Sequence, residues 1–482
     1  MIRRSVRRWV GLDEPGSSRI WRRIESPNVW KRCTPMPPSE ASPRQDGGFT
    51  LSENSLLRLL TLCILYVAQG IPYGFVAITL AAYLTSSGLE EGVVGGFLAM
   101  MTLPWTFKWV WGPLIDRFGI PSMGRRRPWI LLAQAGMIST IAVMAFIPSM
   151  SEHITLLGWL VLIHNIFNSL QDVAVDALAV DLLREEERGR VSGLMYGSKF
   201  LGTVIGGAFL SRVLVHSGFN TVFIVQIGML VFISLFPLLL LERPGERLLP
   251  WTAGSAQSNS TDAISQSMLL LFKRLGRAFS LQSTIIAGII GLLLFIGSGA
   301  LGPITQKLLL QDLGWSQVEL TDIEGFYGVL LGLMGSLLGG FLADLLGPKR
   351  IIAFGSICLG LSYLCFALMS PAIIGSGWFS WDSYSAIVTY LLLSGFMTSL
   401  ITVGLFSMYI TVSWPVVAAT QFTAYMAILN LSTTIGQWTA GHFSTLGVVT
   451  VLIIFASLQI AVVALLPLID VHQTRRVLGE VS

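Results

Sequence analysis

Four ionisable residues lie inside stretches of sequence that are otherwise apolar, and they carry the chemistry this chain could perform: Lys108, Asp172, Asp176 and Lys199. Asp172 and Asp176 are four residues apart, so on a helix they share one face. A helix rises about 1.5 Å per residue, which places Lys108, Asp176 and Lys199 at one depth, roughly 12–14 Å inside the predicted cytoplasmic ends of their helices. Asp172 lies one turn deeper.

Two carboxylates one turn apart in a poorly solvated place disfavour simultaneous ionisation, so one is expected to bind a proton. Because Lys108 shares the depth of Asp176, we expect it to favour the charged form of that residue and leave Asp172 as the proton carrier. The two lysines would then suit an anionic solute. The alternative is that Lys108 and Asp176 form a charge pair that only locks two helices together.

Uncharged polar residues in the same apolar stretches are further candidates for binding a solute or a proton, with hydrogen bonding between helices as the alternative interpretation. They are Gln69, Gln171, Gln421 and Asn430. Gln437 lies on the same segment as the last two, for which the packing role is favoured. His164 is interpreted as a packing histidine. Trp105, Trp109 and Trp111 are interpreted as interfacial or packing aromatics, with stacking on a sugar left open for one of them.

These residues must be positioned by membrane-spanning helices. The chain has 482 residues, of which 53% are hydrophobic and 12% charged, about half the charged fraction of a soluble protein. Apolar runs long enough to cross a ~30 Å hydrocarbon core recur along it. They predict an all-α protein with twelve transmembrane helices, at 56–84, 92–114, 128–148, 155–182, 191–215, 219–241, 283–309, 323–346, 351–370, 385–411, 420–442 and 447–469.

The polar segments divide the chain. Residues 1–50 read as a disordered basic cytoplasmic tail. Residues 51–241 form an N-terminal six-helix bundle, 242–282 a cytoplasmic linker, 283–469 a C-terminal six-helix bundle and 470–482 a second cytoplasmic tail.

Lysine and arginine distribution predicts the orientation. Basic residues follow the second, fourth, eighth and twelfth helices, whereas four of the alternate loops contain none. By the positive-inside rule both termini and the linker are cytoplasmic. The loops without lysine or arginine are 85–91, 149–154, 371–384 and 443–446.

Several function classes are excluded or disfavoured. The chain has no Gly-x-x-x-x-Gly-Lys-Ser/Thr loop, which argues against a self-contained ATP-driven pump. It has no His-Glu-x-x-His and no Gly-x-Ser-x-Gly, which argues against the commonest hydrolases. Its four cysteines lack the spacing of a zinc site or a disulfide framework. We therefore expect no enzyme activity, no cofactor, no metal and no nucleic-acid partner.

One motif occurs twice. Gly112-Pro-Leu-Ile-Asp116-Arg117-Phe-Gly, followed by Arg125, Arg126 and Arg127, matches Gly340-Phe-Leu-Ala-Asp344-Leu-Leu-Gly347-Pro-Lys349-Arg350. Both copies end an even-numbered helix on the predicted cytoplasmic side. Two copies of a six-helix unit in one orientation are the plan of a transporter whose site lies between its halves. Each aspartate could pair with basic groups when the inner gate closes, or the motif could only hold the loop inside.

The doubled motif resembles the loop signature of the major facilitator superfamily. The second copy lacks the basic residue at Leu345, and the first has four residues inserted before its arginines. The resemblance implies a secondary transporter that works by alternating access, with the inner-gate role for Gly112, Asp116, Arg117, Arg125 and Arg126, and for their counterparts Gly340, Asp344, Gly347, Lys349 and Arg350.

Other segments narrow the resemblance to AmpG-type muropeptide permeases. They are Gln69-Gly-Ile-Pro-Tyr-Gly, Leu103-Pro-Trp-Thr-Phe-Lys108-Trp-Val-Trp, Gln171-Asp172-Val-Ala-Val-Asp176-Ala and Ala419-Thr-Gln421-Phe. Acetyl-coenzyme A transporters share several of them. This resemblance implies a multi-pass protein of the bacterial inner (cytoplasmic) membrane that moves an organic, anionic solute together with protons, and that functions as a monomer in the lipid bilayer.

Three alternatives stay open at this point. A transporter of this family could carry an acyl-coenzyme A or another metabolite instead of a muropeptide. A non-transporting membrane scaffold of the same fold would have no need of buried charges at matched depth. A membrane-embedded enzyme lacks a recognisable catalytic constellation.

Overall fold

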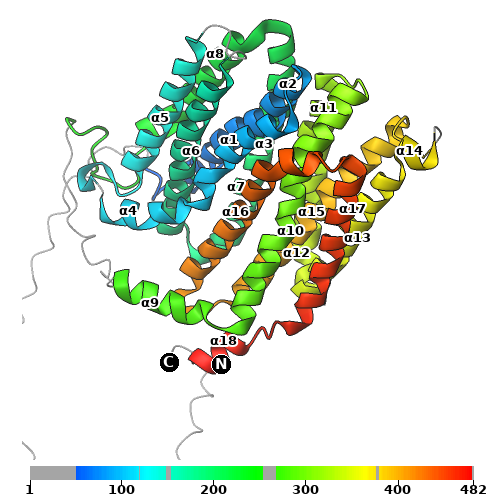
Figure 1. Cartoon of the computed structure of the whole chain (residues 1–482). Helices are drawn as coiled ribbons and strands as arrows, with labels where there is room; N and C mark the ends of the chain where they lie inside the picture. The colour runs from blue at the N-terminus through cyan, green and yellow to red at the C-terminus, as the bar shows by residue number, and fades with distance from the viewer. Residues whose placement is uncertain (1–49, 119, 148–152, 253–267, 376–378, 480–482) are drawn as a thin grey trace, which may run out of the picture. The chain divides into compact units, whose positions relative to one another are not determined.

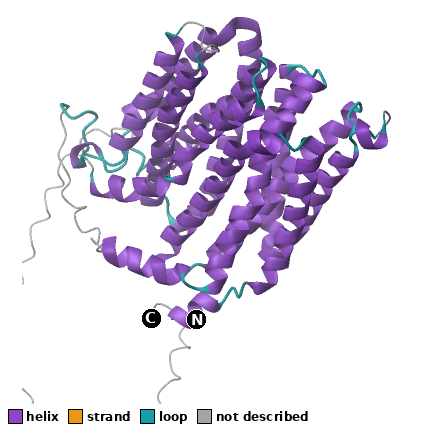
Figure 2. Cartoon of the chain, viewed as in Figure 1, coloured by secondary structure: helices purple, strands orange, loops and turns teal. Residues whose placement is uncertain are grey.

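A computed structural model of the chain describes residues 50–118, 120–147, 153–252, 268–375 and 379–479. The part from Gly48 onward forms one compact unit. Its described residues are almost entirely helical (Figures 1 and 2), and the single β-bridge among them joins Thr50 to Leu241. The basic tail predicted for residues 1–50 falls almost wholly outside the described part.

The first half contains α1 and its continuations η1 and α2, then α3 with η2 and α4, then α5, α6, α7, η5 and α8. Their bounds are α1 Ser55–Gly74, η1 Phe75–Leu80, α2 Ala81–Ser86, α3 Glu91–Thr106, η2 Lys108–Val110, α4 Trp111–Arg117, α5 Arg127–Ala145, α6 Ile154–Leu182, α7 Glu185–Val204, η5 Ile205–Phe209 and α8 Leu210–Leu239.

The second half follows the linker helix α9. Its bounds are α9 Met268–Phe279, α10 Gln282–Lys307, η6 Leu308–Asp312, α11 Gln317–Asp322, η7 Ile323–Gly328, α12 Val329–Leu346, α13 Pro348–Leu368, α14 Pro371–Ile374, α15 Tyr384–Val412, η8 Pro415–Val417, α16 Ala418–Ser444, α17 Val448–Ala461, η9 Val462–Leu468 and α18 Gln473–Leu478.

Ten helices of the described part are long and apolar enough to cross a membrane. One of these spans, Val191–Leu239, covers both predicted segments 191–215 and 219–241, because the helical hydrogen bonds run past Gly218, whose φ of 75° breaks the helix direction. The predicted segment 420–442 corresponds to α16, which has 27 residues but is too polar to count among the ten.

Packing in the first half recurs in the second. α1 packs against α7 as α10 packs against α16, and α5 packs against α6 as α13 packs against α15. Two hydrophobic cores result. One is built from residues between Leu51 and Leu240, and the other from Ala287 to Val471 with Ala82 added. α3 and α16 form the main contact between the halves.

Glycines allow the closest of these crossings. A Cβ added to Gly70 would lie 2.2 Å from the Lys199 carbonyl oxygen, and one added to Gly74 would lie 2.3 Å from that of Thr203. The backbones of α1 and α7 therefore touch without room for a side chain, as expected for small-residue helix interfaces. This crossing holds Lys199 against α1.

The helices end in two layers. We call the layer that carries the Thr50–Leu241 bridge and α9 the linker end, and the opposite layer, which carries Thr85, Glu91 and Lys307, the distal end. α9 lies across the linker end at an angle to the longer helices (Figure 1).

Candidate functional site

The predicted charged residues do come together, but not with the predicted partners. Lys108 Nζ lies 3.4 Å from Asp172 Oδ2, and both side chains are largely buried. We had expected Lys108 to pair with Asp176, one turn away. The reason lies in the helix: the predicted run 92–114 is not continuous, because α3 ends at Thr106 after Pro104 and Lys108 begins the 3-10 turn η2. The depth predicted for Lys108 assumed a straight helix, so it did not identify the correct aspartate.

Asp176 instead accepts a hydrogen bond from the Tyr66 hydroxyl of α1. Its carboxyl group is exposed to a cavity of about 300 Å³ between α1, α6 and α7. The same cavity reaches Leu183 and Ser192, which lie near the linker end. Asp176 is therefore the carboxylate of the pair that water can reach, whereas Asp172 is buried against its lysine.

Lys199 has no carboxylate of the described residues within ion-pair distance. Its Nζ lies 5.0 Å from the centroid of the Trp105 ring, and Lys108 Nζ lies 5.9 Å from the same ring. Cation–π attraction thus holds two ammonium groups beside one indole. For Trp105, the sequence left open whether the ring packs between helices or stacks on a sugar. The structure places it beside both lysines, and its Nε1 is buried without a hydrogen-bond partner among the described residues.

Two amides near this cluster also lack partners. Gln69 and Asn168 are fully buried, and neither the oxygen nor the nitrogen of either amide has a hydrogen bond to a residue that the structure describes. Asn168 precedes Asp172 by one turn on α6, so it shares the face that carries both aspartates. Such groups cost free energy unless something satisfies them. Asn168 was missed in the sequence, although its i, i+4, i+8 spacing with Asp172 and Asp176 was a readable signal.

Gln171 has a different environment. Its Nε2 donates to the Leu65 carbonyl oxygen at 2.9 Å, and its Oε1 accepts from Gln134 at 2.9 Å. These bonds tie α1, α5 and α6 together and favour the packing interpretation. His164 likewise contacts Thr140 through Nδ1 at 2.9 Å, as expected for a packing histidine.

The polar residues of α16 divide between the two halves. Asn430 Nδ2 donates to the Trp105 carbonyl oxygen at 3.2 Å, and Gln437 Oε1 accepts from Thr102 at 3.0 Å. Both bonds join α16 to α3, so the second half closes one wall of the site. Gln421 stays within its own half, where its Oε1 accepts from the Trp414 backbone nitrogen.

At the linker end, the first motif copy is fastened to neighbouring helices. Arg126 Nε lies 2.8 Å from Asp181 Oδ2 at the end of α6. The Glu242 carboxylate accepts hydrogen bonds from the backbone nitrogens of Arg125, Arg126 and Arg127. Gly112 and Arg126 line a cavity of about 160 Å³. The side chains of Asp116 and Arg117, both predicted gate residues, lie outside the described part.

The Arg127 guanidinium, which is 1% exposed, completes these contacts, which we call the linker clamp. It donates to the carbonyl oxygens of Pro237 and Leu238 at the end of α8, and to those of Arg247 and Leu248 in the linker. Arg127 thereby satisfies carbonyls that a helix end leaves without partners. Burial raises the pKa of Glu242, and burial together with the Glu242 charge raises the pKa of Glu246 to about 7.

The second motif copy is more open. Gly347 makes the turn with a φ of 89°, and Gly340 packs near Val403. Lys349 donates to the Ile469 carbonyl oxygen. Asp344 and Arg350 are exposed, and no ion pair joins either to a described residue. Only the first copy is therefore fastened to its neighbours by ion pairs of described residues.

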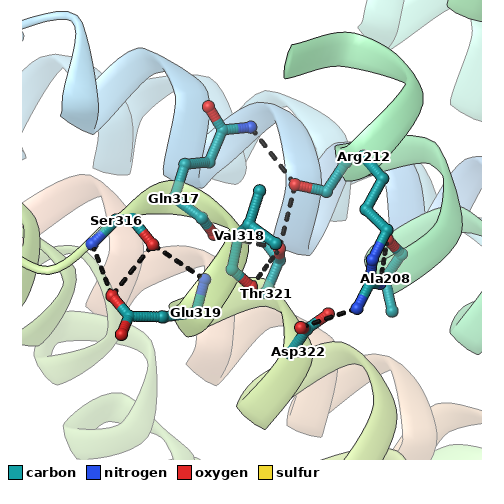
Figure 3. Close-up of polar contacts among 9 residues, drawn as sticks. Ala208, Arg212, Ser316, Gln317, Val318, Glu319, Thr321 and Asp322 are labelled. Carbon is teal, nitrogen blue, oxygen red and sulfur yellow. Dashed lines mark hydrogen bonds and ion pairs between the residues drawn. The ribbon is translucent and has the colours of Figure 1, made fainter. Parts of the chain in front are cut away.

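The distal end carries ion pairs that sequence reasoning did not single out. Glu91 pairs with Lys307 at 2.7 Å, and Arg212 pairs with Asp322 at 2.7 Å. Figure 3 shows the second pair, with Gln317 and Thr321 also reaching Ser211. Both pairs join the first half to the second. We call these the distal contacts.

Among the described residues, no three His, Cys, Asp or Glu side chains are placed to hold a metal ion. The site is instead a cluster of ionisable and polar side chains. Two ammonium groups lie beside one indole, and one of them pairs with a carboxylate of α6.

Comparison with known proteins gives one family. A sequence model of the Major Facilitator Superfamily matches residues 59–437. The anhydromuropeptide permease of Escherichia coli is 26% identical over 324 residues, which are 65% of this chain and 61% of that protein. The chain thus aligns with less than two thirds of this relative's length.

Solved structures share the fold at low identity. A mutant of the nucleoside transporter NupG superposes with a TM-score of 0.64 at 14% identity, covering 85% of this chain and 99% of that one. A D-xylose–proton symporter superposes with a TM-score of 0.64 at 12% identity, covering 86% of this chain and 97% of that one.

Proposed function

Because the chain belongs to the Major Facilitator Superfamily, a multi-pass membrane transporter family, we propose that it is a secondary active transporter that moves an organic anion by alternating access, coupled to protons. The observation that carries this proposal is Lys199. A cation at membrane depth is costly unless paired, yet this one forms no ion pair with any described residue and lies over the Trp105 ring, beside a second lysine. A solute carboxylate or phosphate would supply the missing partner.

The solute we favour is a cell-wall muropeptide bearing a carboxylate. The Escherichia coli relative is named an anhydromuropeptide permease. A sugar ring can stack on the Trp105 indole, and the amides of Gln69 and Asn168 can bond hydroxyl and amide groups. An acyl-coenzyme A, which is also anionic, is the second candidate.

We assign the proton to Asp176. Asp172 forms an ion pair with Lys108, whereas Asp176 forms no ion pair with a described residue and accepts its hydrogen bond from the neutral Tyr66 phenol. Asp176 also faces the cavity, through which a proton can arrive and leave. A proton on Asp176 removes one negative charge from the cluster, so the lysines hold an anion more strongly; its loss favours release.

The topology we propose has twelve transmembrane helices, two six-helix bundles at 51–241 and 283–469 and both termini in the cytoplasm of a bacterium, with the chain in the inner membrane. The linker end is then cytoplasmic. The distal contacts close the outer side, and the cavity at Asp176 opens inward. A cysteine replacing Ser87 should be labelled from outside the cell, and one replacing Ser280 should not. The reverse pattern would overturn this orientation.

The inner gate is the linker clamp together with the motif. When the linker end closes, Asp116 and Asp344 are expected to pair across the gate with basic groups, and release of these pairs opens it.

The decisive experiment is uptake of labelled anhydro-muropeptide into proteoliposomes with an imposed proton gradient. We expect accumulation by the parent protein, and by Lys273→Gln as a control in the linker helix. Lys199→Gln should lose it. Absence of uptake with any gradient would favour the scaffold alternative. Uptake of acyl-coenzyme A but not of the muropeptide would identify acyl-coenzyme A as the solute.

A further inference from the structure

A third carboxylate, Glu324, lies in the π-helical turn η7 and has no role in the proposed cycle. Its Oε2 accepts a hydrogen bond from Gln306 Nε2 at 3.3 Å. No described cation lies within ion-pair distance of it. The two cations of the distal end are engaged elsewhere, Lys307 with Glu91 and Arg212 with Asp322.

The amide opposite Glu324 is only half satisfied. Gln306 is 5% exposed, and its Oε1 is buried without a hydrogen-bond partner among the described residues. An ionised carboxylate only accepts hydrogen bonds, so it cannot satisfy this oxygen. A protonated carboxyl can, because an acid and a primary amide are able to form two complementary bonds, N–H to acid oxygen and O–H to amide oxygen. The site therefore fits the protonated form.

Residues on either side of Glu324 hold the two halves together. Asp322 pairs with Arg212 (Figure 3), and a Cβ added to Gly325 would lie 2.9 Å from the Ala208 backbone nitrogen in η5. Here two π-helical turns cross with their backbones in contact. The backbones of η7 and η5 are already in contact, so η7 cannot move closer to η5. A change in the hydrogen bonding of η7 is therefore expected to move the distal contacts as well.

We propose that Glu324 is a second proton-binding site, and that its proton keeps the distal contacts closed. With the proton bound, the carboxyl and the Gln306 amide satisfy each other. Glu324 is partly buried, so after proton loss its carboxylate lacks a cation and is incompletely hydrated. Water reaches it when η7 separates from η5, which breaks the Arg212–Asp322 pair and opens the distal end.

This inference deepens the proposed function, since it assigns the closing of the outer side to proton uptake there. The titratable groups on the elements around η7 do not replace Glu324 in this role: the two cations of the distal end are paired, the carboxylates Glu91 and Asp322 are their partners, Glu319 is exposed and caps α11, Tyr390 is a neutral phenol, and two groups belong to the central cluster. No titratable residue occurs in η5 or in the distal half of α12. These groups are Glu91, Lys307, Arg212, Asp322, Glu319, Tyr390, Tyr196 and Lys199, together with the exposed phenols Tyr327 of η7 and Tyr384 of α15.

The test measures opening of the distal end without any solute. In a protein whose native cysteines are replaced by serine, Ser211→Cys places a thiol that is fully buried at the distal contacts. Labelling by an impermeant maleimide from outside is expressed relative to Ser87→Cys, an exposed loop position, which corrects for thiol ionisation. We expect relative labelling to rise roughly tenfold from about pH 5.5 to about pH 8.5, the size of one net hydrogen bond.

Glu324→Gln should label slowly at both pH values, because its amide retains the two bonds to Gln306 and cannot lose a proton. Glu319→Gln is the matched control: it removes a nearby carboxylate but keeps the helix cap, and should retain the pH response. An unchanged response in Glu324→Gln would overturn the proposal.

Gln306→Leu tests the Glu324–Gln306 pair even if the Glu324→Gln variant fails to insert into the membrane. It removes the amide that the protonated carboxyl needs, so labelling should be fast even at about pH 5.5. Slow labelling of this variant at acid pH would refute the role of the pair. Because no solute is present, such a failure leaves proton-coupled uptake through Asp176 to be judged by the transport assay alone.

Discussion

Neutralising Lys199 tests the anion site most directly. Among the described residues this ammonium group forms no ion pair, and it acts on the carboxylate of Asp176 only at longer range, so Lys199→Gln breaks no close charge pair. On the proposed binding mode the cation–π contact with Trp105 is kept when the solute binds, so it cancels from the difference. What is lost is one charge-assisted bond to the solute, worth about 1.5–3 kcal/mol. At about 1.4 kcal/mol per tenfold, the solute Kd should rise about 10- to 150-fold.

The assay is equilibrium binding of the anionic solute to purified protein, with folding checked by thermal unfolding in the same detergent. Lys199→Arg keeps the charge beside the indole and should bind within several-fold of the parent protein. Lys108→Gln is a contrast. It leaves Asp172 buried without its ion-pair partner, a loss of about 3–5 kcal/mol, so the amount of folded protein should fall.

A Lys199→Gln variant that binds the anion within about twofold of the parent would refute the reasoning. So would an equal loss in Lys273→Gln, because that residue lies in the linker helix α9, away from the central cluster.

Further outcomes follow from the other contacts. Asp176→Asn should abolish gradient-driven accumulation yet retain solute exchange, measured in proteoliposomes; accumulation that persists would return the coupling role to Asp172. Because burial and the Glu242 charge raise the pKa of Glu246 from 4.5 to about 7, the contribution of Glu246 to the stability of the linker is complete below about pH 4.5 and is lost as the pH rises through about 7. Hydrogen exchange in the linker should therefore increase over that window, and Glu246→Gln should remove the dependence. Asp116→Asn should slow transport while leaving insertion and solute binding largely intact; unchanged transport in both it and Asp344→Asn would reduce the motif to a topological signal.

The chemistry-bearing residues could be named from sequence because their position is anomalous. A lysine or aspartate in a long apolar run is expensive in a membrane, which selects Lys108, Asp172, Asp176 and Lys199 without any structure. Their partners could not be named in the same way. Lys108 lies beyond the break in the helix after Pro104, and its ion-pair partner is Asp172 instead of the expected Asp176.

Other features gave no local signal at all. The distal ion pairs join residues that flank different helices, and Arg127 looked like one basic residue among three until α8 was packed beside it. Glu324 stood just inside a predicted helix and was passed over. Its significance depends on Gln306, eighteen residues earlier, and on the contact between Gly325 and η5.

By itself, the sequence determined that this is an all-helical membrane protein with a duplicated plan and ionisable groups at membrane depth, because composition, run length and charge placement act along the chain. Only the tertiary structure decided which lysine faces which aspartate, which ammonium of the described residues lacks an ion pair and which residues join the two halves at the distal end. Those outcomes depend on helix kinks and on backbone approach at glycines, which bring together residues that sequence distance does not relate.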